Sequence, residues 1–252
     1  MSKFVAIIPA RYASTRFPGK PLALLGGVPI IQRVYERVAG VVSDVCVATD
    51  DARIEQAVQR FGGRVVMTSD QHRSGTDRCF EAYQKLGTDA DVVINVQGDE
   101  PFIAPQQLQT IMHCFADSHT EIATLVKPFA LGEPMEHISN PNSPKVVLDA
   151  NGYALYFSRS VIPYLRGKDF ETWSQHHTYL KHIGLYAYRT DALARITAMP
   201  QGTLEVSESL EQLRWLQAGL RIKVGTTDQE TIGIDTPDDL QRAEQFLATQ
   251  QG

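Results

Sequence analysis

Residues 4–22 read FVAIIPARYASTRFPGKPL. The first five residues are apolar, which predicts a short buried β-strand over residues 4–8. The loop that follows contains small residues, glycine and prolines together with three cations, Arg11, Arg16 and Lys20. In open parallel sheets, ligands bind at the carboxyl ends of strands. This stretch therefore favours an α/β fold with an anion site directly after its first strand.

Strand-like and helix-like segments alternate after this loop. The predicted strands cover residues 44–48, 64–67 and 91–96, and the predicted helices cover residues 29–38, 52–61, 77–86 and 105–116. Within the first helix, Ile30, Val34 and Val38 recur at helical spacing and define one apolar face. Such alternation predicts a mostly parallel sheet with helices on both faces.

The pattern changes after about residue 121. Strand-like segments at 121–129, 145–148, 153–158 and 181–188 follow one another with turn signals between them. They predict a smaller antiparallel insertion at about 121–189, a lid or dimer surface within a single α/β domain of residues 1–252. The first pattern returns with a helix over 204–218, a strand over 221–224 and a helix that begins near Thr236.

Composition excludes several classes of protein. The net charge of -5 argues against a nucleic-acid binder. The three cysteines are odd in number and none are at CxxC spacing, which fits a reducing compartment rather than a disulfide framework or a thiolate zinc site. The first apolar run is too short for a signal peptide, and no stretch is long enough for a membrane span. We therefore expect a soluble, cytoplasmic protein with no membrane partner.

The first 35 residues contain basic side chains and no acidic one. A nucleoside triphosphate carries about four negative charges, and fixed Arg and Lys side chains are suited to screening them. The loop is neither a P-loop nor a dinucleotide-binding fingerprint, because GxxxxGK[ST] and GxGxxG are both absent. A solvated basic surface loop is the alternative interpretation.

The strand at 91–96 leads into Gln97-Gly98-Asp99-Glu100-Pro101. A carboxylate at this position suits Mg²⁺, which prefers one or two carboxylates, substrate phosphates and waters. Asp99 is the better candidate, and Glu100 either orients the loop or caps the next helix; the motif alone is also compatible with a simple turn. Asp235 precedes a helix, where a capping role and a metal-binding role are both open.

Taken together, IPARYASTRFPGKPL, SGTDR, GDEP, LEVSESLEQLR and IDTPDDL resemble, in order, the motifs of the CMP-Kdo synthetases, the 3-deoxy-manno-octulosonate cytidylyltransferases. The resemblance extends over residues 4–246. It implies a fold like that of nucleotide-diphospho-sugar transferases, a homodimer, and a Mg²⁺-dependent transfer of CMP from CTP to Kdo for lipopolysaccharide synthesis, with release of pyrophosphate.

The resemblance also implies roles for individual residues. The expected catalytic residues are Arg11, Lys20, Asp99 and Asp235, of which Asp99 and Asp235 bind the metal. The expected nucleotide-binding residues are Arg11, Arg16, Lys20, Ser74, Gly75, Arg78 and Gln97. The sugar-binding residues that it implies are His182, Tyr186, Glu211 and Gln212. Arg159 is a further expected sugar-binding residue, chosen as the cation nearest the sugar carboxylate. For Ser74, simple helix capping is an alternative, and for His182 and Tyr186 it is core packing. For Glu211 the alternative is a solvated helix face, because Glu205, Glu208 and Glu211 recur at a spacing of three.

Two segments depart from the family pattern, both on the expected sugar side. The chain has Asn140-Pro141-Asn142-Ser143-Pro144 where close relatives read NPNAV, and residues 166–179 have no recognisable counterpart. The sugar acid is therefore open between Kdo, its 8-amino derivative and a sialic acid. Three alternatives are more remote. The motifs expected of a sugar-1-phosphate nucleotidyltransferase and of a glycosyltransferase are absent. A non-catalytic nucleotide-binding regulator is disfavoured because the loop that contains Arg11, Arg16 and Lys20, here called the cation loop, and both aspartates are intact.

Overall fold

The computed structural model describes residues 2–230 and 232–250. They form two compact units, one of residues 2–109 with 232–250 and one of residues 110–230. The boundary lies within helix α4 (Pro105–His113). None of the described helices is long and apolar enough to cross a membrane.

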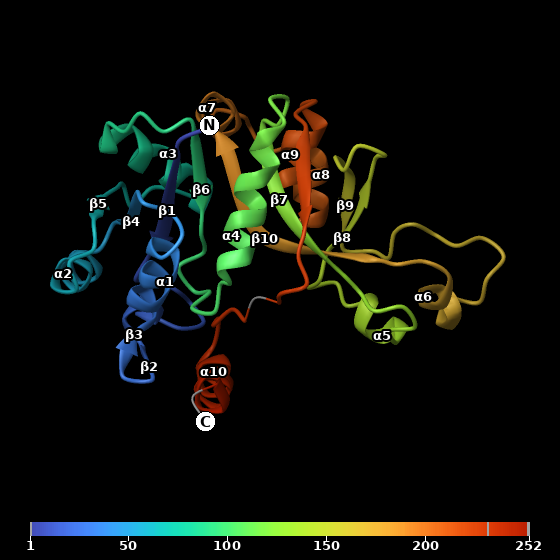
Figure 1. Ribbon diagram of the computed structural model, residues 1–252, viewed down its shortest axis with the longest axis horizontal. Coiled ribbons are helices and arrows are strands. Elements are labelled where there is room, and N and C mark those ends of the chain that lie inside the picture. The colour runs from blue at the N-terminus through green and yellow to red at the C-terminus, as the bar shows by residue number, and fades with distance from the viewer. Residues whose placement is uncertain (1, 231, 251–252) are drawn as a thin grey trace. The chain divides into compact units, whose positions relative to one another are not determined.

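The sheet of the first unit consists of four parallel strands in the order β6-β1-β4-β5. Their bounds are β1 (Phe4–Ala10), β4 (Val45–Thr49), β5 (Val65–Met67) and β6 (Val92–Asn95). The chain places β4 and then β5 on one side of β1 and returns to place β6 on the other side (Figure 1). The winding therefore reverses at β1, and the loops after β1 and β6 flank the reversal point, where such sheets bind ligands.

Helices α1 (Ile30–Ala39), α2 (Ala52–Arg60) and α3 (Gly75–Leu86) connect these strands, and α10 (Pro237–Gln250) ends the unit. The apolar face predicted for α1 is buried, because Ile30, Val34 and Val38 have no exposed surface. The remaining elements of the unit are the short helix η1 (Lys20–Leu22) and the strand pair β2 (Leu24–Leu25) and β3 (Val28–Pro29). The predicted mostly parallel α/β fold is confirmed.

Gly98 lies where the loop after β6 touches β1. A Cβ atom on Gly98 would be 2.8 Å from the carbonyl oxygen of Pro9, a distance that backbone atoms do not tolerate. The absence of a side chain thus allows the two loops to approach closely, and it fixes the position of the next residue, Asp99.

Replacement of Gly98 by alanine is expected to lower the free energy of unfolding by about 1–3 kcal/mol, because β1 or the loop must shift to admit the methyl group. Urea denaturation measures this change. Gly40→Ala is the matched control, since its Cβ would be 3.4 Å from the nearest atom and its φ is -68°. Equal stabilities of the two variants would contradict the close packing inferred for Gly98.

The second unit contains five main strands with mixed pairing. They are β7 (Ile122–Pro128), β8 (Lys145–Leu148), β9 (Ala154–Ser158), β10 (Leu180–Arg189) and β11 (Ile222–Thr226). Strand β10 pairs antiparallel with β7, and β8 pairs antiparallel with both β10 and β9, whereas β11 runs parallel to β7. The predicted antiparallel strands are present, and the predicted insertion of about 121–189 lies wholly within this unit. Its role as a sugar-side or dimer surface stays a prediction.

Helices of the second unit are short. They are η2 (Cys114–Ala116), α5 (Met135–Ile138), η3 (Phe170–Thr172), α6 (Trp173–His176), α7 (Thr190–Thr197), α8 (Thr203–Glu208) and α9 (Gln212–Gln217). The prediction of one helix over 204–218 is wrong, because α8 and α9 are separated at Ser209. Ser209 has a φ of 50° in the left-handed region, and its carbonyl accepts a hydrogen bond from Arg159 Nη2 at 3.2 Å. A contact distant in sequence thus stabilises the break.

Candidate active site

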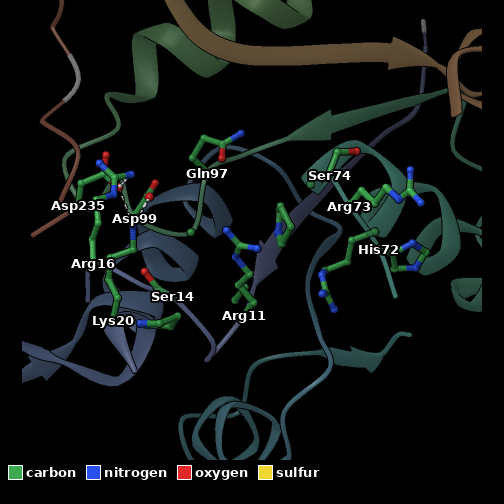
Figure 2. Close-up of a pocket in the computed structure, with 16 residues that line it drawn as sticks. Arg11, Ser14, Arg16, Lys20, His72, Arg73, Ser74, Gln97, Asp99 and Asp235 are labelled. Carbon is green, nitrogen blue, oxygen red and sulfur yellow. Dashed lines mark hydrogen bonds and ion pairs between the residues drawn. The ribbon is translucent and has the colours of Figure 1, made fainter. Parts of the chain in front are cut away.

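A pocket of about 290 Å³ lies at the carboxyl ends of β1 and β6, within the first unit (Figure 2). Its cationic lining residues are Arg11, Arg16, Lys20, Arg73 and Arg78, and its acidic lining residues are Asp99 and Asp235. Five cations against two carboxylates give the pocket lining a positive balance, which suits a polyanion. The structure thus brings together the residues predicted to bind the nucleotide and the metal, with Ser74, Gly75 and Gln97 among them.

The cation loop after β1 is held in a closed conformation by contacts between its own residues and with Arg53. Gly19 N donates to Tyr12 O at 3.0 Å, and Gly19 adopts a φ of 72°, which glycine reaches without strain. The Tyr12 ring stacks beneath the Arg53 guanidinium, 3.3 Å from ring centroid to carbon. Arg53 in turn donates twice to the Asp51 carboxylate, which also caps α2. These contacts hold the loop so that Lys20, directly after Gly19, begins η1 at the mouth of the sheet.

At one end of the pocket, Lys20 bridges the two carboxylates (Figure 2). Its Nζ lies 2.5 Å from Asp99 Oδ2 and 3.1 Å from Asp235 Oδ1. Arg16 Nη2 also lies 3.1 Å from Asp235 Oδ1. The backbone joins the two carboxylate-bearing loops, because Ile234 N donates to Asp99 O at 2.9 Å.

The alternative role of Asp235 as a helix cap is excluded by the hydrogen bonds at the start of α10. Asp239 N donates to Thr236 Oγ1, and Asp239 Oδ2 accepts from Thr236 N, so these two residues form the reciprocal cap. Asp239 Oδ2 also accepts from the backbone N–H of Asp235. The Asp235 carboxylate is therefore turned to the pocket rather than to the helix.

The two carboxylates fit a divalent cation. Both approach one positive atom, the Lys20 ammonium, so the geometry already places two hard oxygen ligands around a single cation. Within residues 2–230 and 232–250, no group of three or more His, Cys, Asp or Glu side chains is arranged around a common point. Mg²⁺ does not need such a group, because it completes its coordination with substrate phosphates and waters.

The other end of the pocket is formed by the start of α3 (Figure 2). Ser74 is the N-cap of this helix, and its Oγ accepts from Asp77 N at 3.1 Å. The capping alternative is thus confirmed, and the helix N-terminus faces the pocket where an anion or a carbonyl is favoured. Gly75 packs against β1, since its Cβ would be 3.3 Å from Pro9 Cγ.

Arg78 lines the same end but is only 4% exposed. Its Nη1 donates to Thr68 Oγ1 at 2.6 Å, and its Nη2 donates to Asp50 Oδ2 at 2.8 Å. The guanidinium is therefore held rigidly by the segments that follow β4 and β5, which fixes its position before any ligand binds.

Sequence reasoning did not assign Ser14, His72 or Arg73, which also line the pocket. Ser14 Oγ accepts from Phe17 N and braces the cation loop, and His72 pairs with Glu81. Arg73 is an exposed cation directly before the predicted SGTDR motif. Because Arg73 directly precedes that motif, its place in the pocket could have been predicted from the sequence.

Glu100 does not cap α4. The carboxyl group is enclosed, with Oε2 lacking a hydrogen-bond partner among the described residues. Burial, followed by the negative charge of Asp99, raises the pKa of Glu100 to about 8. The start of α4 is instead closed by Gln107, whose Oε1 accepts from Ala104 N at 2.9 Å.

All five residues predicted to bind the sugar lie in the second unit. The His182 and Tyr186 rings lie 5.4 Å apart, and Tyr186 packs edge-on against Trp215 of α9 at 5.3 Å. Burial, with the negative charge of Glu211, raises the pKa of Tyr186 well above its ordinary value. Gln212 is buried, and its Nε2 has no hydrogen-bond partner among the described residues, a state that costs about 1–3 kcal/mol unless a ligand or water satisfies it.

Arg159, the fifth, is used differently. Its guanidinium donates to the carbonyl oxygens of Glu208, Pro141 and Ser209 at 2.5, 2.8 and 3.2 Å. Three of its five N–H groups are thus engaged. They join the end of β9 to the end of α8, to Ser209 and to the segment before β8 that contains Pro141. The remaining two are the donors with which Arg159 can bind a carboxylate.

Beside Arg159, Lys145 is fully buried, and its Nζ donates to the carbonyl oxygens of Asn140 and Arg159. Burial lowers the pKa of Lys145 from 10.5 to about 8, Arg159 acts in the same direction, and Glu208 opposes them.

We expect the free energy of unfolding to rise between about pH 8 and pH 10.5 because of Lys145. In this window the unfolded chain binds a proton at this lysine that the folded chain has released, so raising the pH favours folding. Denaturation of the wild-type protein and of Lys145→Met at pH 7, 8.5 and 10 isolates the contribution, because other titrating groups cancel in the difference. A difference that is constant with pH would contradict the lowered pKa.

Comparison with known proteins agrees with these observations. The cytidylyltransferase family model matches residues 5–222. The 3-deoxy-manno-octulosonate cytidylyltransferase of Parabacteroides distasonis is 66% identical over 98% of this chain and 99% of its own length. The chain belongs to the 3-deoxy-manno-octulosonate cytidylyltransferase family. Further curated members are those of Bacteroides thetaiotaomicron, 66% identical over 97% of this chain and 98% of its own, and of Thermodesulfovibrio yellowstonii, 47% identical over 97% and 98%.

Two solved structures share the fold of this chain. A CMP:2-keto-3-deoxy-manno-octonic acid synthetase, solved in complex with CTP, superimposes with a TM-score of 0.90 at 44% identity, over 99% of this chain and 100% of the other. A cytidylyltransferase from Leptospira borgpetersenii matches with a TM-score of 0.64 at 14% identity, over 99% and 88% of the two chains, which shows the shared fold alone.

Proposed function

We propose that this cytidylyltransferase transfers CMP from CTP to the anomeric hydroxyl of 3-deoxy-manno-octulosonate and releases pyrophosphate, a step of lipopolysaccharide synthesis. The observation that carries the proposal is the pocket at the winding reversal, where five cations and two carboxylates meet. The names of the relatives that are 66% identical over nearly their whole length support the choice of CTP and of this sugar acid.

In this mechanism the cation loop binds the triphosphate. Arg11 and Arg16 are exposed at the pocket and supply planar donor pairs to phosphate oxygens, whereas Lys20 supplies a point charge. Transfer of a nucleotidyl group requires positioning and charge screening more than covalent assistance. The loop is already closed by Gly19 and by Tyr12 against Arg53, so its backbone needs little reorganisation when the nucleotide binds.

Asp99 and Asp235 would hold Mg²⁺. The metal, when bound, supplies charge stabilisation on the phosphate oxygens and lowers the pKa of a coordinated hydroxyl. Lys20 Nζ lies between the two carboxylates in this structure, so Asp99 and Asp235 would hold a metal only with the Lys20 ammonium displaced from them. The same ammonium is then available to the phosphates in the pocket that Lys20 also lines.

The opposite end of the pocket would bind the nucleoside. The start of α3 offers backbone N–H groups beside Ser74 and Gly75, and Arg78 is fixed by Thr68 and Asp50. Gln97, on the loop after β6, adds an amide with both a donor and an acceptor. Such a fixed set of donors suits the carbonyl group of a cytosine.

We propose further that the enzyme works in the cytoplasm as a homodimer. The three free cysteines fit a reducing compartment. Large apolar side chains are exposed in the second unit, among them Leu131 at 69% and Tyr164 at 75%. Light scattering at micromolar concentration tests the assembly, and a monomeric mass would overturn it.

The function is tested by mixing the purified protein with CTP, Kdo and Mg²⁺ and following pyrophosphate release. We expect release with CTP but not with UTP or ATP, and none after addition of EDTA. Release with 8-amino-Kdo or a sialic acid, but not with Kdo, would replace the proposed substrate. CTP binding without release with any sugar acid would overturn the enzymatic proposal.

A further inference from the structure

The pairing of β10 with β7 contains a bulge beside His182. Ile183 pairs with Leu125 and Tyr186 pairs with Thr124, so two residues of β10, Gly184 and Leu185, stand opposite no residue of β7. Thr124 is fully buried and its hydroxyl points into this irregularity. The bulge therefore surrounds one hydroxyl group with backbone oxygens.

The Thr124 hydroxyl has three neighbours at hydrogen-bond distance. Its Oγ1 lies 2.9 Å from Leu185 O, 3.2 Å from Ile183 O and 3.1 Å from His182 Nε2. A hydroxyl has one proton to donate, and a carbonyl oxygen only accepts. The proton is therefore directed to the carbonyls, and a lone pair of Oγ1 faces the imidazole. Nε2 of His182 must then carry the hydrogen that this lone pair accepts.

The other ring nitrogen is consequently a bare acceptor. A neutral imidazole carries one hydrogen, so protonation at Nε2 leaves a lone pair on Nδ1. Burial lowers the pKa of His182 to about 4, so the ring is neutral near pH 7. His182 is half-buried, and within the described residues its Nδ1 has no hydrogen-bond partner.

We infer that Thr124 fixes the tautomer of His182, so that the ring offers Nδ1 as an acceptor to a hydroxyl group of the sugar acid and not to its carboxylate. This inference rests on the proposed function, in which His182 belongs to the sugar site. A carboxylate has only lone pairs to offer and is repelled by a bare nitrogen, whereas a hydroxyl donates to it. Buried Gln212 Nε2, a donor without a partner among the described residues, has the complementary chemistry for a carboxylate or another acceptor. Thr124 is thus a positioning residue that acts through His182.

Nitrogen-15 NMR of the free protein at pH 7 reads the tautomer directly. The chain has seven histidines, so His182→Gln identifies the signals of His182 by their loss. We expect a protonated Nε2 and an unprotonated Nδ1 in the wild-type protein and in Thr124→Ser, which keeps the hydroxyl. In Thr124→Val, of similar shape, the hydrogen is expected to shift toward Nδ1. A protonated Nδ1 in the wild-type protein would overturn the inference, even if Thr124→Val failed to fold.

Kinetics with the same variants supply the second measurement. Loss of one hydrogen bond from the sugar predicts a KM for the sugar acid about 2- to 10-fold higher in Thr124→Val, with KM for CTP unchanged and Thr124→Ser close to wild type. An equal rise in both KM values, or an unchanged tautomer in Thr124→Val, would overturn the inference. Because the NMR measurement needs no substrate, inactivity of the wild-type protein toward Kdo would count against the proposed function alone.

Discussion

Asp99→Asn is expected to lower kcat about 10²- to 10³-fold at saturating CTP and sugar acid, and to raise the Mg²⁺ concentration needed for half-maximal rate. The substitution keeps the shape of the side chain but removes a negative charge that lies 2.5 Å from a cation in the free protein. Loss of one preorganised electrostatic contact at a reacting centre has costs of this size. Pyrophosphate release measured across a magnesium titration gives both quantities.

The control for this variant is Asp238→Asn, which removes an exposed carboxylate only three residues from Asp235. It lies outside the residues that line the pocket, so its kinetics should match those of the wild-type protein. Wild-type turnover and an unaltered magnesium requirement in Asp99→Asn would show that this carboxylate does not hold the metal.

Lys20→Ala is expected to have two effects of opposite sign. Turnover should fall about 10²-fold, because the phosphates lose a fixed positive charge. Binding of Mn²⁺, as a probe of the metal site in the absence of nucleotide, should become about tenfold tighter, because the ammonium no longer competes for Asp99 and Asp235. Steady-state kinetics measure the first effect, and electron paramagnetic resonance of free Mn²⁺ measures the second.

Lys3→Ala is the matched control, since Lys3 is an exposed cation paired with Asp89 away from the pocket. Neither turnover nor Mn²⁺ affinity should change in it. Normal turnover in Lys20→Ala would refute the assignment of the cation loop to the triphosphate. Weaker Mn²⁺ binding would instead show that Lys20 does not compete with a metal for the carboxylates.

Local pattern predicted the parallel part of the fold and the pocket well, because both depend on short-range features. The apolar spacing of Ile30, Val34 and Val38 predicted α1, and the cations of residues 11–20 identified a loop that does line a pocket. Asp99 followed from its place after a buried strand. The position of a residue at the end of a parallel strand is enough to bring it to the common edge of the sheet.

Features that depend on contacts distant in sequence were not predictable. Residues 204–218 contain no glycine or proline, so nothing local indicates the break that Ser209 introduces and Arg159 stabilises. The sequence left the role of Asp235 open between helix cap and metal ligand for a related reason. Its carboxylate can face Lys20 only because Thr236 and Asp239 cap the helix without it. The sequence likewise does not show how many donors Arg159 has available for a ligand, because its three carbonyl partners are distant in sequence.

The first unit is discontinuous in sequence, and this affects how the site is assembled during synthesis. Asp99 lies before residues 110–230 and Asp235 lies after them, although the two carboxylates share one lysine. A ribosome must therefore complete the whole second unit before the second carboxylate exists. In a nascent chain Asp99 is therefore synthesised well before Asp235, and in a chain cleaved within residues 110–230 the two acids lie on separate fragments. The two-carboxylate centre thus needs chain from both sides of the second unit.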